Sequence, residues 1–386
     1  MKSPERGIPE RDAVEAIGPS GSPDREETRV MDEPHPTLSL PHRLSVGLGA
    51  PFTPTPSRDV AALAQRLFAV TPTAVTRFAT ERDDTFRLIV GGDPHGFVLK
   101  ISPPGDSPAE IALQGAAVTH ASARDAALPL QRFVPPVTAD PLHNGRAVRL
   151  VRFLPGQLLG DVTASPTELR SVGRMLGRLT NALADFEHPA ATRWLAWDLV
   201  QLGELSELLP CLEGEDRQRV VASVLEVLTT ETLPALHATP RQVVHNDFHG
   251  GNLVVDKGAP EFVTGILDFG DVVSSHRAAD LAIAMSYAGS TAQSHSRTFP
   301  RPGHDPWAPA LTLAAGYREA TWLGDEEVAL LPALVLGRLI QRLLLGSWLA
   351  TNRPENAEYT GRNLDITWRQ FVALRGSLSP REWVGH

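Results

Sequence analysis

The 386-residue sequence has almost no cysteine, and this shortage limits what the protein can be. Its single cysteine, Cys211, cannot form an intramolecular disulfide or a thiolate metal cage. The first residues, Met-Lys-Ser-Pro-Glu, also lack the apolar core of a signal peptide. We therefore expect a protein of the reducing cytoplasm.

The sequence also lacks long uncharged apolar runs and clusters of basic residues. The longest apolar stretch, Leu330 to Ala350, is interrupted by Arg338, Gln341 and Arg342, so it predicts a buried helix and not a membrane span. A net charge of -9 without clustered arginine or lysine argues against phosphate-backbone contacts. We expect neither a membrane nor a nucleic-acid partner.

Lysine is the third shortage. Of the 36 basic residues only Lys2, Lys100 and Lys257 are lysine, and all the others are arginine. Lys100 ends the run Gly-Phe-Val-Leu-Lys. A residue type that the chain avoids so strongly is expected there for its compact ammonium group, which a planar guanidinium does not replace.

Composition and periodicity divide the chain into three parts. Residues 1–56 hold 10 of the 33 prolines and one aromatic residue, which predicts a disordered tail. The second methionine, Met31, leaves open a natural start at that position. Residues 57–155 alternate between helical and strand patterns and end at Pro155-Gly156, where we predict a hinge. We predict that they form a small lobe. Its predicted helices begin at Asp59 and span Pro108–His120, and its predicted strands are Phe78–Val90, Phe97–Lys100, Leu128–Phe133 and Val148–Leu154.

Residues 156–386 are mostly helical and predict a larger lobe. One short hairpin interrupts them, with strands Asn252–Asp256 and Val263–Asp268. The expected architecture is α+β, with this hairpin at the junction of the two lobes. The predicted helical runs are Leu169–Phe186, Leu199–Leu209, Val220–Leu236, Leu311–Trp322, Val328–Thr351 and Ile366–Leu374.

The segment from His245 to Asn252 carries the clearest chemical signal. Asp247 and Asn252 lie five positions apart before a strand, and Asp268-Phe269-Gly270 ends the next strand. This is the spacing of a kinase catalytic loop followed by D-F-G. In that chemistry one carboxylate accepts the proton of an attacking hydroxyl, while an amide oxygen and a second carboxylate bind Mg²⁺ on the nucleotide phosphates.

Each of these residues alone has an ordinary explanation, because Asp, Asn and Gly are common turn formers. Their order and spacing, together with a Val-Leu-Lys strand far upstream, favour phosphoryl transfer. A protein kinase is disfavoured, since both the G-x-G-x-x-G loop and A-P-E are absent from the sequence.

From about Ser57 to Leu378 the chain resembles the aminoglycoside phosphotransferase/choline kinase superfamily, and most of all its hydroxylysine-kinase-like branch. The catalytic loop and the D-F-G segment are the specific parts of this resemblance. The supporting motifs are Glu81–Phe86, Val98–Lys100, Phe153–Gly156, Phe186–Pro189, Trp197–Leu199, His245–Asn252, Gly265–Asp271 and Asp280–Ala282.

The resemblance implies a protein-kinase-like two-lobe fold with nucleotide binding in the lobe of residues 57–155 and the acceptor site in residues 156–386. It implies that Lys100 binds the α- and β-phosphates, Asp247 is the catalytic base, and Asn252 and Asp268 bind Mg²⁺. His245 is expected to brace the loop.

Other positions depart from the family pattern or have a second interpretation. Arg82 and Thr85 belong to the implied nucleotide loop, although the family usually has Asn at the position of Thr85, so backbone amides are the expected phosphate contacts. Glu110 is the candidate acidic partner of Lys100, because Ala112 stands where the family has its acid. Asp280, which starts a helical pattern, is expected to be structural.

Several further side chains have competing readings. His249, His295 and His304 fit no zinc spacing and are expected to be solvated loop residues. Trp194 and Trp197 are expected to be core or interface residues and not a ligand cage. The adjacent Asp198 is either a surface acid or a site for a substrate ammonium. These residues do not identify the acceptor.

The segment Gly289–Pro309 is an insertion relative to the family, serving either as a cover for the acceptor pocket or as a neutral surface loop. The predicted activity is transfer of the γ-phosphoryl group of ATP or GTP to a hydroxyl of an amino-bearing small molecule such as hydroxylysine. The alternatives are an antibiotic phosphotransferase and a nucleotide-binding pseudokinase, and the oligomeric state stays open.

Overall fold

The computed structural model describes residues 39–48, 53–78, 80, 83–288, 305–352 and 357–377. Most of the predicted disordered tail therefore lies outside the described residues. Within that predicted tail, however, residues 40–47 form helix α1 (Leu40–Gly47), in which Leu40 and Leu44 are buried. The apolar spacing of four residues places both leucines on one face of the helix, which the proline-rich composition of the tail concealed.

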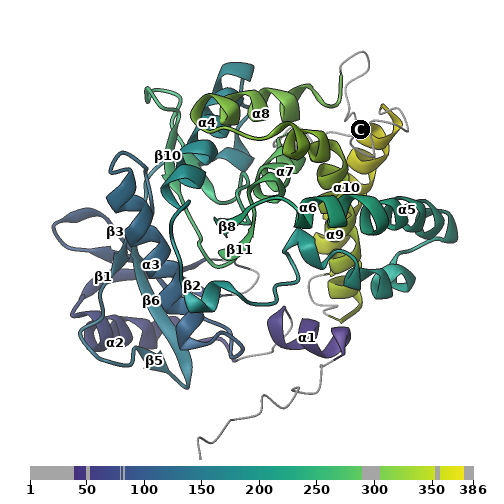
Figure 1. The fold of residues 1–386 in the computed structure, drawn as a ribbon. Helices are drawn as coiled ribbons and strands as arrows, with labels where there is room; N and C mark the ends of the chain where they lie inside the picture. The colour runs from purple at the N-terminus through teal and green to yellow at the C-terminus, as the bar shows by residue number, and fades with distance from the viewer. Residues whose placement is uncertain are drawn as a thin grey trace, which may run out of the picture. The chain divides into compact units, whose positions relative to one another are not determined.

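The smaller lobe is built on an antiparallel sheet in the strand order β1-β2-β3-β6-β4, with β5 paired to β6. Helix α2 (Ser57–Phe68) covers one face, where its Leu63 and Leu67 share a core with Phe86 and Leu99. Figure 1 shows this sheet at the left of the molecule. Its strands are β1 (Pro72–Phe78), β2 (Asp84–Val90), β3 (Asp93–Ile101), β4 (Phe133–Val134), β5 (Leu142–His143) and β6 (Arg146–Arg152).

Helix α3 (Pro108–Arg124) follows the third strand and begins at a capping box. The Ser107 hydroxyl accepts the Glu110 backbone N–H, and the Glu110 carboxylate accepts the Ser107 backbone N–H. Pro108 occupies the first helical position, where its missing N–H removes no bond. These local signals explain why the predicted helix start at residue 108 is correct.

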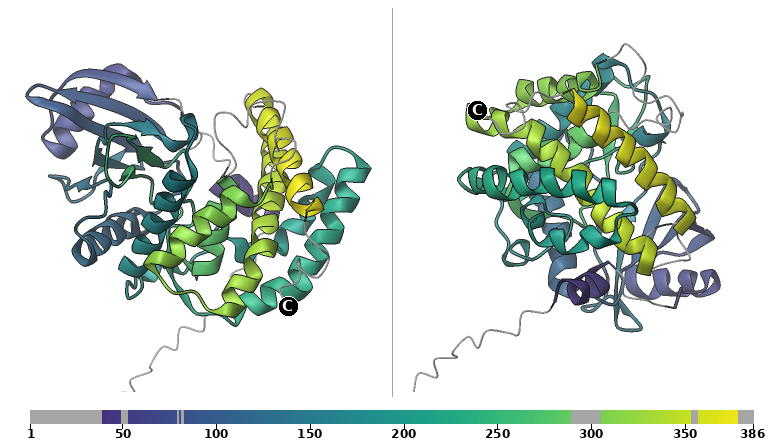
Figure 2. Two further views of the ribbon diagram at one scale, coloured as in Figure 1. Left: turned by 90° about the horizontal axis from the view of Figure 1, so that it is seen from above. Right: turned by 90° about the vertical axis from the view of Figure 1, so that its right-hand side faces the viewer.

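The larger lobe is helical, as predicted, and lies at the right and top of Figure 1, away from the sheet. The left view of Figure 2 shows the same separation from above. The α+β two-lobe fold class is thereby confirmed. Its helices are α4 (Pro166–Ala182), α5 (Glu215–Val227), α6 (Leu233–His237), α7 (Arg277–Tyr287), α8 (Ala308–Ala320), α9 (Asp325–Asn352) and α10 (Ala357–Gly376).

Two glycines allow α4 and α8 to pack at unusually close range. A Cβ atom at Gly173 would lie 1.9 Å from the Leu313 carbonyl oxygen, and one at Gly316 would lie 1.9 Å from the Arg170 carbonyl oxygen. No side chain fits at either position, so the close approach of the two helices depends on both glycines.

Helix α9 is the apolar stretch that the sequence predicted to be a buried helix, and this prediction is confirmed. This helix is long and apolar enough to cross a membrane, but 78% of its most apolar 18-residue segment is buried inside the protein. Arg338, only 1% exposed, lies in the middle of this buried segment. A charge held at that position needs partners, and they lead to the candidate site.

Two small sheets lie at the junction of the lobes. The predicted hairpin is present as β9 (Leu253–Val255) and β10 (Val263–Ile266), and β7 (Gln157–Leu158) adds to it. The sequence missed a second pair, β8 (Arg241–Val244) with β11 (Val273–His276), and also the helix α7 that follows β11. Strands of four residues with polar members give too few positions to establish a period.

Three other segments differ from their predicted form. The predicted helix Leu199–Leu209 consists of the 3₁₀ segments η3 (Leu199–Gln201) and η4 (Glu204–Cys211), with Gly203 between them and Pro210 inside the second. The predicted helix Val220–Leu236 contains a π turn, η5 (Leu228–Thr232), between α5 and α6. The predicted strand Leu128–Phe133 is reduced to the two-residue β4 and an isolated bridge at Leu130. The short segment η1 (Leu159–Asp161) and the segment η2 (Pro189–Ala191) complete the described elements.

Candidate active site

A cavity of about 290 Å³ lies between the sheet of the smaller lobe and the catalytic-loop region. Lys100 and Thr85 line it from the sheet, while Asp247, Asn252 and Asp268 line it from the junction. The structure thus brings five of the predicted site residues to one cavity. Their chemical roles stay predictions, and the contacts described next support them.

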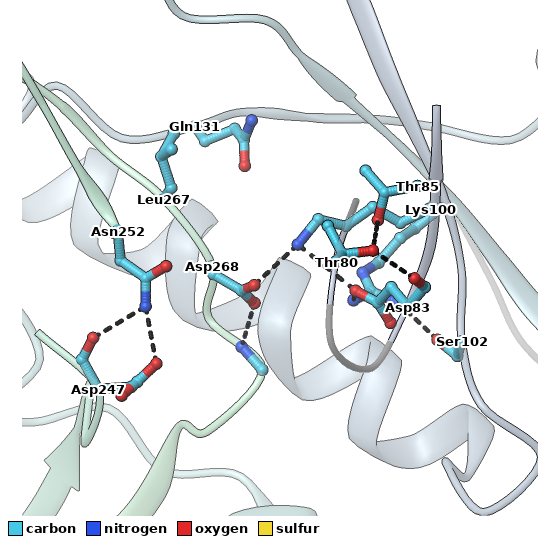
Figure 3. A network of polar contacts seen from close by, with 12 residues as sticks. Thr80, Asp83, Thr85, Lys100, Ser102, Gln131, Asp247, Asn252, Leu267 and Asp268 are labelled. Atoms are coloured by element: carbon cyan, nitrogen blue, oxygen red, sulfur yellow. Dashed lines mark hydrogen bonds and ion pairs between the residues drawn. The ribbon is translucent and has the colours of Figure 1, made fainter. Parts of the chain in front are cut away.

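Lys100 lies in a row of polar residues that crosses the sheet. On β3 it faces Thr85 of β2 and Arg149 of β6 in register. Its Nζ atom lies 2.9 Å from Asp268 Oδ2 and 3.5 Å from Asp83 Oδ2. Arg149 donates to the same Asp83 oxygen at 2.6 Å. Asp83, Lys100, Arg149 and Asp268 are called the nucleotide face below, and Figure 3 shows three of them linked by these contacts.

Asp268 follows β10 with a left-handed backbone, φ 54°, which turns its carboxylate toward Lys100. Its other oxygen accepts the backbone N–H of Gly270 at 3.1 Å. Burial alone would raise the pKa of Asp268, but the charges of Lys100 and Arg149 hold it well below its usual range. The carboxylate is therefore ionised at neutral pH, as a ligand for a hard cation must be.

The side-chain amide of Asn252 is oriented by Asp247. Its Nδ2 atom donates to the Asp247 carboxylate at 2.7 Å and to the Asp247 carbonyl at 3.0 Å. Figure 3 shows that the amide oxygen is consequently turned toward Asp268. An amide oxygen and an ionised carboxylate facing one another are the donor set that suits Mg²⁺. Among the described residues no group of three or more His, Cys, Asp or Glu side chains is placed to bind a metal, so the remaining ligands would come from phosphate oxygens and water.

Asp247 has two further partners, His249 and Arg338. Arg338 Nη2 lies 3.4 Å from Asp247 Oδ1, and His249 Nε2 lies 3.3 Å from Asp247 Oδ2. Burial alone would raise the pKa of Asp247, but these neighbours lower it below its usual value. The carboxylate therefore stays ionised and able to accept a hydrogen bond from an acceptor hydroxyl.

His249 is not the solvated loop residue that the sequence predicted. Its ring stacks on Tyr287 with centroids 4.8 Å apart, and its Nδ1 accepts the Gly251 backbone N–H at 2.9 Å. Burial alone would lower the pKa of His249, whereas the Asp247 carboxylate raises it to about 9. The Gly251 N–H opposes protonation at Nδ1, but in either protonation state Nε2 carries the hydrogen that points to Asp247. His295 and His304 lie outside the described residues.

The catalytic loop is held in place from two sides. His245 donates from Nε2 to the Leu267 carbonyl at 3.1 Å, and its Nδ1 accepts the Asp247 N–H at 3.3 Å. Asp280 on α7 accepts the Asn246 N–H at 2.8 Å, where Asn246 has φ 64°. Burial raises the pKa of Asp280 to about 7, and the backbone hydrogen bonds offset only part of this effect. Both residues thus have positions that suit the bracing and structural roles expected of them.

Glu110 does not contact Lys100, so the predicted ion pair is wrong in this structure. Its carboxylate caps α3 through Ser107 and pairs with Arg193 at 2.9 Å. The capping box fixes the Glu110 carboxylate at the start of the helix, and Arg193 occupies its other oxygen. Asp83 and Asp268 are the carboxylates that Lys100 contacts instead.

The two nucleotide-loop candidates have different outcomes. Arg82 lies outside the described residues. Thr85 is buried, lines the cavity, and lies within hydrogen-bonding distance of the Thr80 hydroxyl at 3.3 Å. Thr85 is the acceptor of this hydrogen bond, so its role toward phosphate, and the expectation that backbone amides serve there, stay predictions.

Asp198 differs from its prediction, whereas most of the inserted segment lies outside the described residues. Asp198 is 1% exposed and accepts the Ser275 hydroxyl at 2.7 Å and the Val200 N–H, so it is neither a surface acid nor open to a substrate. Burial raises its pKa. Of Gly289–Pro309, only residues 305–309 are described: α8 begins at Ala308, and Trp307 before it is buried and donates from Nε1 to the Leu374 carbonyl.

Three residues at the site escaped the sequence analysis. Asp83 was part of a recognised motif but had no assigned role, and Arg149 gave no signal at all. Arg338 was noted only as an interruption of an apolar run. That interruption was the available signal, since an arginine inside an otherwise apolar helix requires a buried acceptor.

The model of the phosphotransferase enzyme family matches residues 74–339 of the chain. Hydroxylysine kinase of Danio rerio is 28% identical over 324 residues, covering 78% of this chain and 86% of the relative. Hydroxylysine kinase of Mus musculus is 24% identical over 343 residues, covering 82% of this chain and 88% of the relative.

Solved structures of small-molecule kinases share the fold. A microcompartment-associated aminopropanol kinase superposes with a TM-score of 0.65 at 20% identity, over 85% of this chain and 99% of that chain. The amicoumacin kinase hAmiN, solved in complex with AMP-PNP, Ca²⁺ and Ami, gives a TM-score of 0.60 at 17% identity, over 81% of this chain and 94% of that chain. At these identities the likeness establishes the fold alone.

Proposed function

The chain belongs to the phosphotransferase enzyme family, and from this premise we propose that it transfers the γ-phosphoryl group of a nucleoside triphosphate, ATP or GTP, to a hydroxyl of an amino-bearing small molecule. The nearest substrate class is a hydroxylated amino acid such as hydroxylysine. The proposed location is the cytoplasm, consistent with the single cysteine.

One observation carries this proposal. The cavity has an ionised carboxylate, Asp247, at one end and the Lys100–Asp268 ion pair at the other, with Asn252 bonded to Asp247 between them. A base for an alcohol and a charged site for phosphates therefore share one cavity. This is the minimal arrangement for phosphoryl transfer, in which positioning and charge stabilisation supply most of the catalysis.

The reaction assigns a task to each side chain. The acceptor hydroxyl donates its hydrogen bond, and then its proton, to Asp247 while its oxygen forms a bond to the γ-phosphorus. The bond from that phosphorus to the bridging oxygen of the nucleoside diphosphate breaks, and the diphosphate leaves with the electron pair. Lys100 holds the phosphates of the donor, and Arg338 and His249 hold Asp247 in orientation.

Asn252 and Asp268 are the residues that would hold Mg²⁺. When bound, the cation supplies charge neutralisation at the phosphate oxygens. Asp268 also fixes Lys100 in the absence of a nucleotide, through the 2.9 Å ion pair. Asp83 supports the same ammonium from the smaller lobe.

The hydroxylysine assignment rests on the curated relatives, which share about a quarter of their residues with this chain over most of its length. The pseudokinase alternative is disfavoured, because Lys100, Asp247, Asn252 and Asp268 are all present and directed at one cavity. The antibiotic alternative has only fold-level likeness behind it.

The test is a screen of purified protein for acceptor-dependent nucleotide consumption. Hydroxy amino acids, amino alcohols and aminoglycosides are supplied with Mg-ATP or Mg-GTP, and products are identified by mass spectrometry. The Asp247→Asn variant serves as the matched control, since it keeps the size of the side chain and removes the base. We expect a phosphorylated hydroxy amino acid with the wild type only. Nucleotide consumption that no hydroxyl compound stimulates would refute the proposed function.

A further inference from the structure

Two arginines of α9 meet the end of α7 beside the catalytic base. Arg338 and Arg342 are four residues apart on α9 and so share one helix face. Both lie over the ring of Tyr287, the last residue of α7, with guanidinium carbons 6.0 and 4.4 Å from its centroid. Tyr287 in turn stacks on His249, which contacts Asp247. Asp247, His249, Tyr287, Arg338 and Arg342 are called the acceptor face below.

The two arginines differ in their partners. Arg338 donates to the Trp197 carbonyl and to Gln341 Oε1, both at 2.8 Å, and contacts Asp247. Arg342 forms no ion pair with any carboxylate of the described residues, and its Nη1 atom is buried there without a hydrogen-bond partner. Among its described neighbours, the ring of Tyr287 is the group it packs on.

The pKa directions point the same way. Burial lowers the pKa of Arg342, the neighbouring Tyr287 raises it, and the charge of Arg338 lowers it. Burial alone would raise the pKa of Tyr287, yet the charges of Arg342 and Arg338 lower it below its usual value. A partly buried guanidinium without a counter-charge is costly, and an anion supplied by a ligand removes that cost.

We propose that Arg342, held in plane by Tyr287, binds a carboxylate of the acceptor molecule. The proposal rests on the proposed function and deepens it, because it specifies an anionic group on the substrate. A guanidinium pairs with a carboxylate through two parallel N–H···O bonds, which fixes orientation as well as position. Arg342 adjoins Asp247 through Tyr287 and His249, so an acceptor with its carboxylate on Arg342 would have its hydroxyl on the side of Asp247. A polycationic aminoglycoside would face two arginines instead, which disfavours that class.

The experiment compares hydroxylysine with its decarboxylated diamino alcohol, which keeps the hydroxyl and both amines and lacks only the carboxylate. The measured quantity is the ratio of kcat/KM for the two acceptors, at saturating Mg-nucleotide. It is determined for the wild type, Arg342→Gln, Arg342→Lys and Arg318→Gln. Arg318 is exposed on α8 and outside the site, so its variant makes the same charge change elsewhere.

The wild-type ratio should favour hydroxylysine, and Arg342→Gln should lower the ratio about 10- to 100-fold, the usual worth of a hydrogen-bonded charged group. Arg342→Lys should recover part of the loss, and Arg318→Gln should keep the wild-type ratio. A merely structural role for Arg342 would reduce stability or both rates together and leave the ratio unchanged, which would overturn the inference.

The outcomes separate this inference from the proposed function. Equal wild-type activity on both acceptors, or phosphorylation of an aminoglycoside alone, would overturn the carboxylate site while the phosphotransferase activity stands. Absence of acceptor-dependent nucleotide consumption with every hydroxyl compound would refute the proposed function, and the carboxylate site with it.

Discussion

The nucleotide face and the acceptor face differ in how their charges are balanced. The residues of the nucleotide face all line the cavity, whereas the acceptor face reaches it at Asp247. On the nucleotide face both cations have carboxylate partners: Lys100 contacts Asp268 and Asp83, and Arg149 shares Asp83. On the acceptor face Arg338 contacts Asp247, whereas Arg342 pairs with no carboxylate among the described residues. One face is balanced in the absence of ligand and the other carries unbalanced positive charge.

This difference in charge balance suits the two proposed ligands, a nucleotide and an anionic acceptor. Ion pairs on the nucleotide face hold the side chains in position before the triphosphate arrives, so little reorganisation is needed. The unbalanced guanidinium on the acceptor face gains most when an anion binds, which makes it a source of selectivity. If both proposals hold, nucleotide binding and acceptor choice are controlled by separate residues.

The largest expected effect on kcat comes from removing the proposed base. Asp247→Asn should lower kcat by about 10³-fold or more, because general-base catalysis by a positioned carboxylate is lost. Nucleotide affinity should stay close to wild type, since Asp247 belongs to the acceptor face. Isothermal titration with Mg-nucleotide and a steady-state assay measure the two quantities. Near wild-type turnover in the variant would remove Asp247 from its role.

Asp268→Asn changes a residue of the nucleotide face. It removes the charge of a proposed cation ligand and the partner of Lys100, so Mg-nucleotide affinity and kcat should fall together, by about 100-fold. Asn252→Ala should have the same kind of effect but a smaller one, because no charge is lost. Calorimetry with and without Mg²⁺ checks both. Nucleotide binding that ignores Mg²⁺ and Asp268 alike would contradict the assignment.

Lys100 tests whether the rare lysine was retained for its shape. Lys100→Arg and Lys100→Ala should each weaken nucleotide binding by about 10- to 100-fold, since the larger guanidinium does not fit between Asp268 and Asp83 as a point charge. Both variants are compared by nucleotide titration. A fully active Lys100→Arg would show that the lysine is an accident of composition.

Arg338, on the acceptor face, is expected to position Asp247. Arg338→Lys keeps the charge but loses the fork that bonds Trp197, Gln341 and Asp247, so kcat should fall about tenfold. The nucleotide KM should not change, because the nucleotide face is untouched. Circular dichroism confirms folding. An unchanged kcat in a folded variant would argue that Asp247 is oriented without Arg338.

His276 lies on neither face and should affect folding alone. It is buried, its Nδ1 lies 2.9 Å from the Thr239 hydroxyl, and burial lowers its pKa to about 4. The unfolded chain therefore binds a proton near pH 6.5 that the folded protein does not, so stability present above pH 6.5 is lost as the pH falls toward 4.

His276→Asn should reduce this pH-dependent loss by about 1–3 kcal/mol, as measured by denaturant unfolding at pH 7 and pH 5. Asparagine keeps a donor for Thr239 and cannot take up the proton. An identical pH dependence in the two proteins would mean that His276 is protonated in the folded state at pH 5.

The sequence predicts local features of this molecule better than contacts between distant ones. The start of α3 follows from Ser107-Pro108 and a glutamate three positions after the serine, because a capping box is a local motif. The catalytic loop and the Asp268 segment are likewise encoded by short spacings. Lys100 was found by its rarity, although its β-strand neighbours were not.

The acidic partner of Lys100 could not be predicted, because it depends on strand register. Asp83 reaches Lys100 and Arg149 since β2, β3 and β6 align residues separated by up to 66 positions. The capping role of Glu110 is encoded locally by Ser107, three positions before it. The family pattern instead suggested an acid of this helix as the partner of Lys100. Arg338 meets Asp247 across 91 positions, a contact set by the packing of α9.

The most direct test of the account is a competition in a single reaction. Hydroxylysine, its decarboxylated analogue and an aminoglycoside are supplied at equal concentration with limiting Mg-nucleotide, and the phosphorylated products are quantified by mass spectrometry. The account predicts that phosphohydroxylysine dominates with the wild type, and that the product disappears with Asp247→Asn. A product mixture that ignores the carboxylate, or a phosphorylated aminoglycoside as the main product, would contradict it.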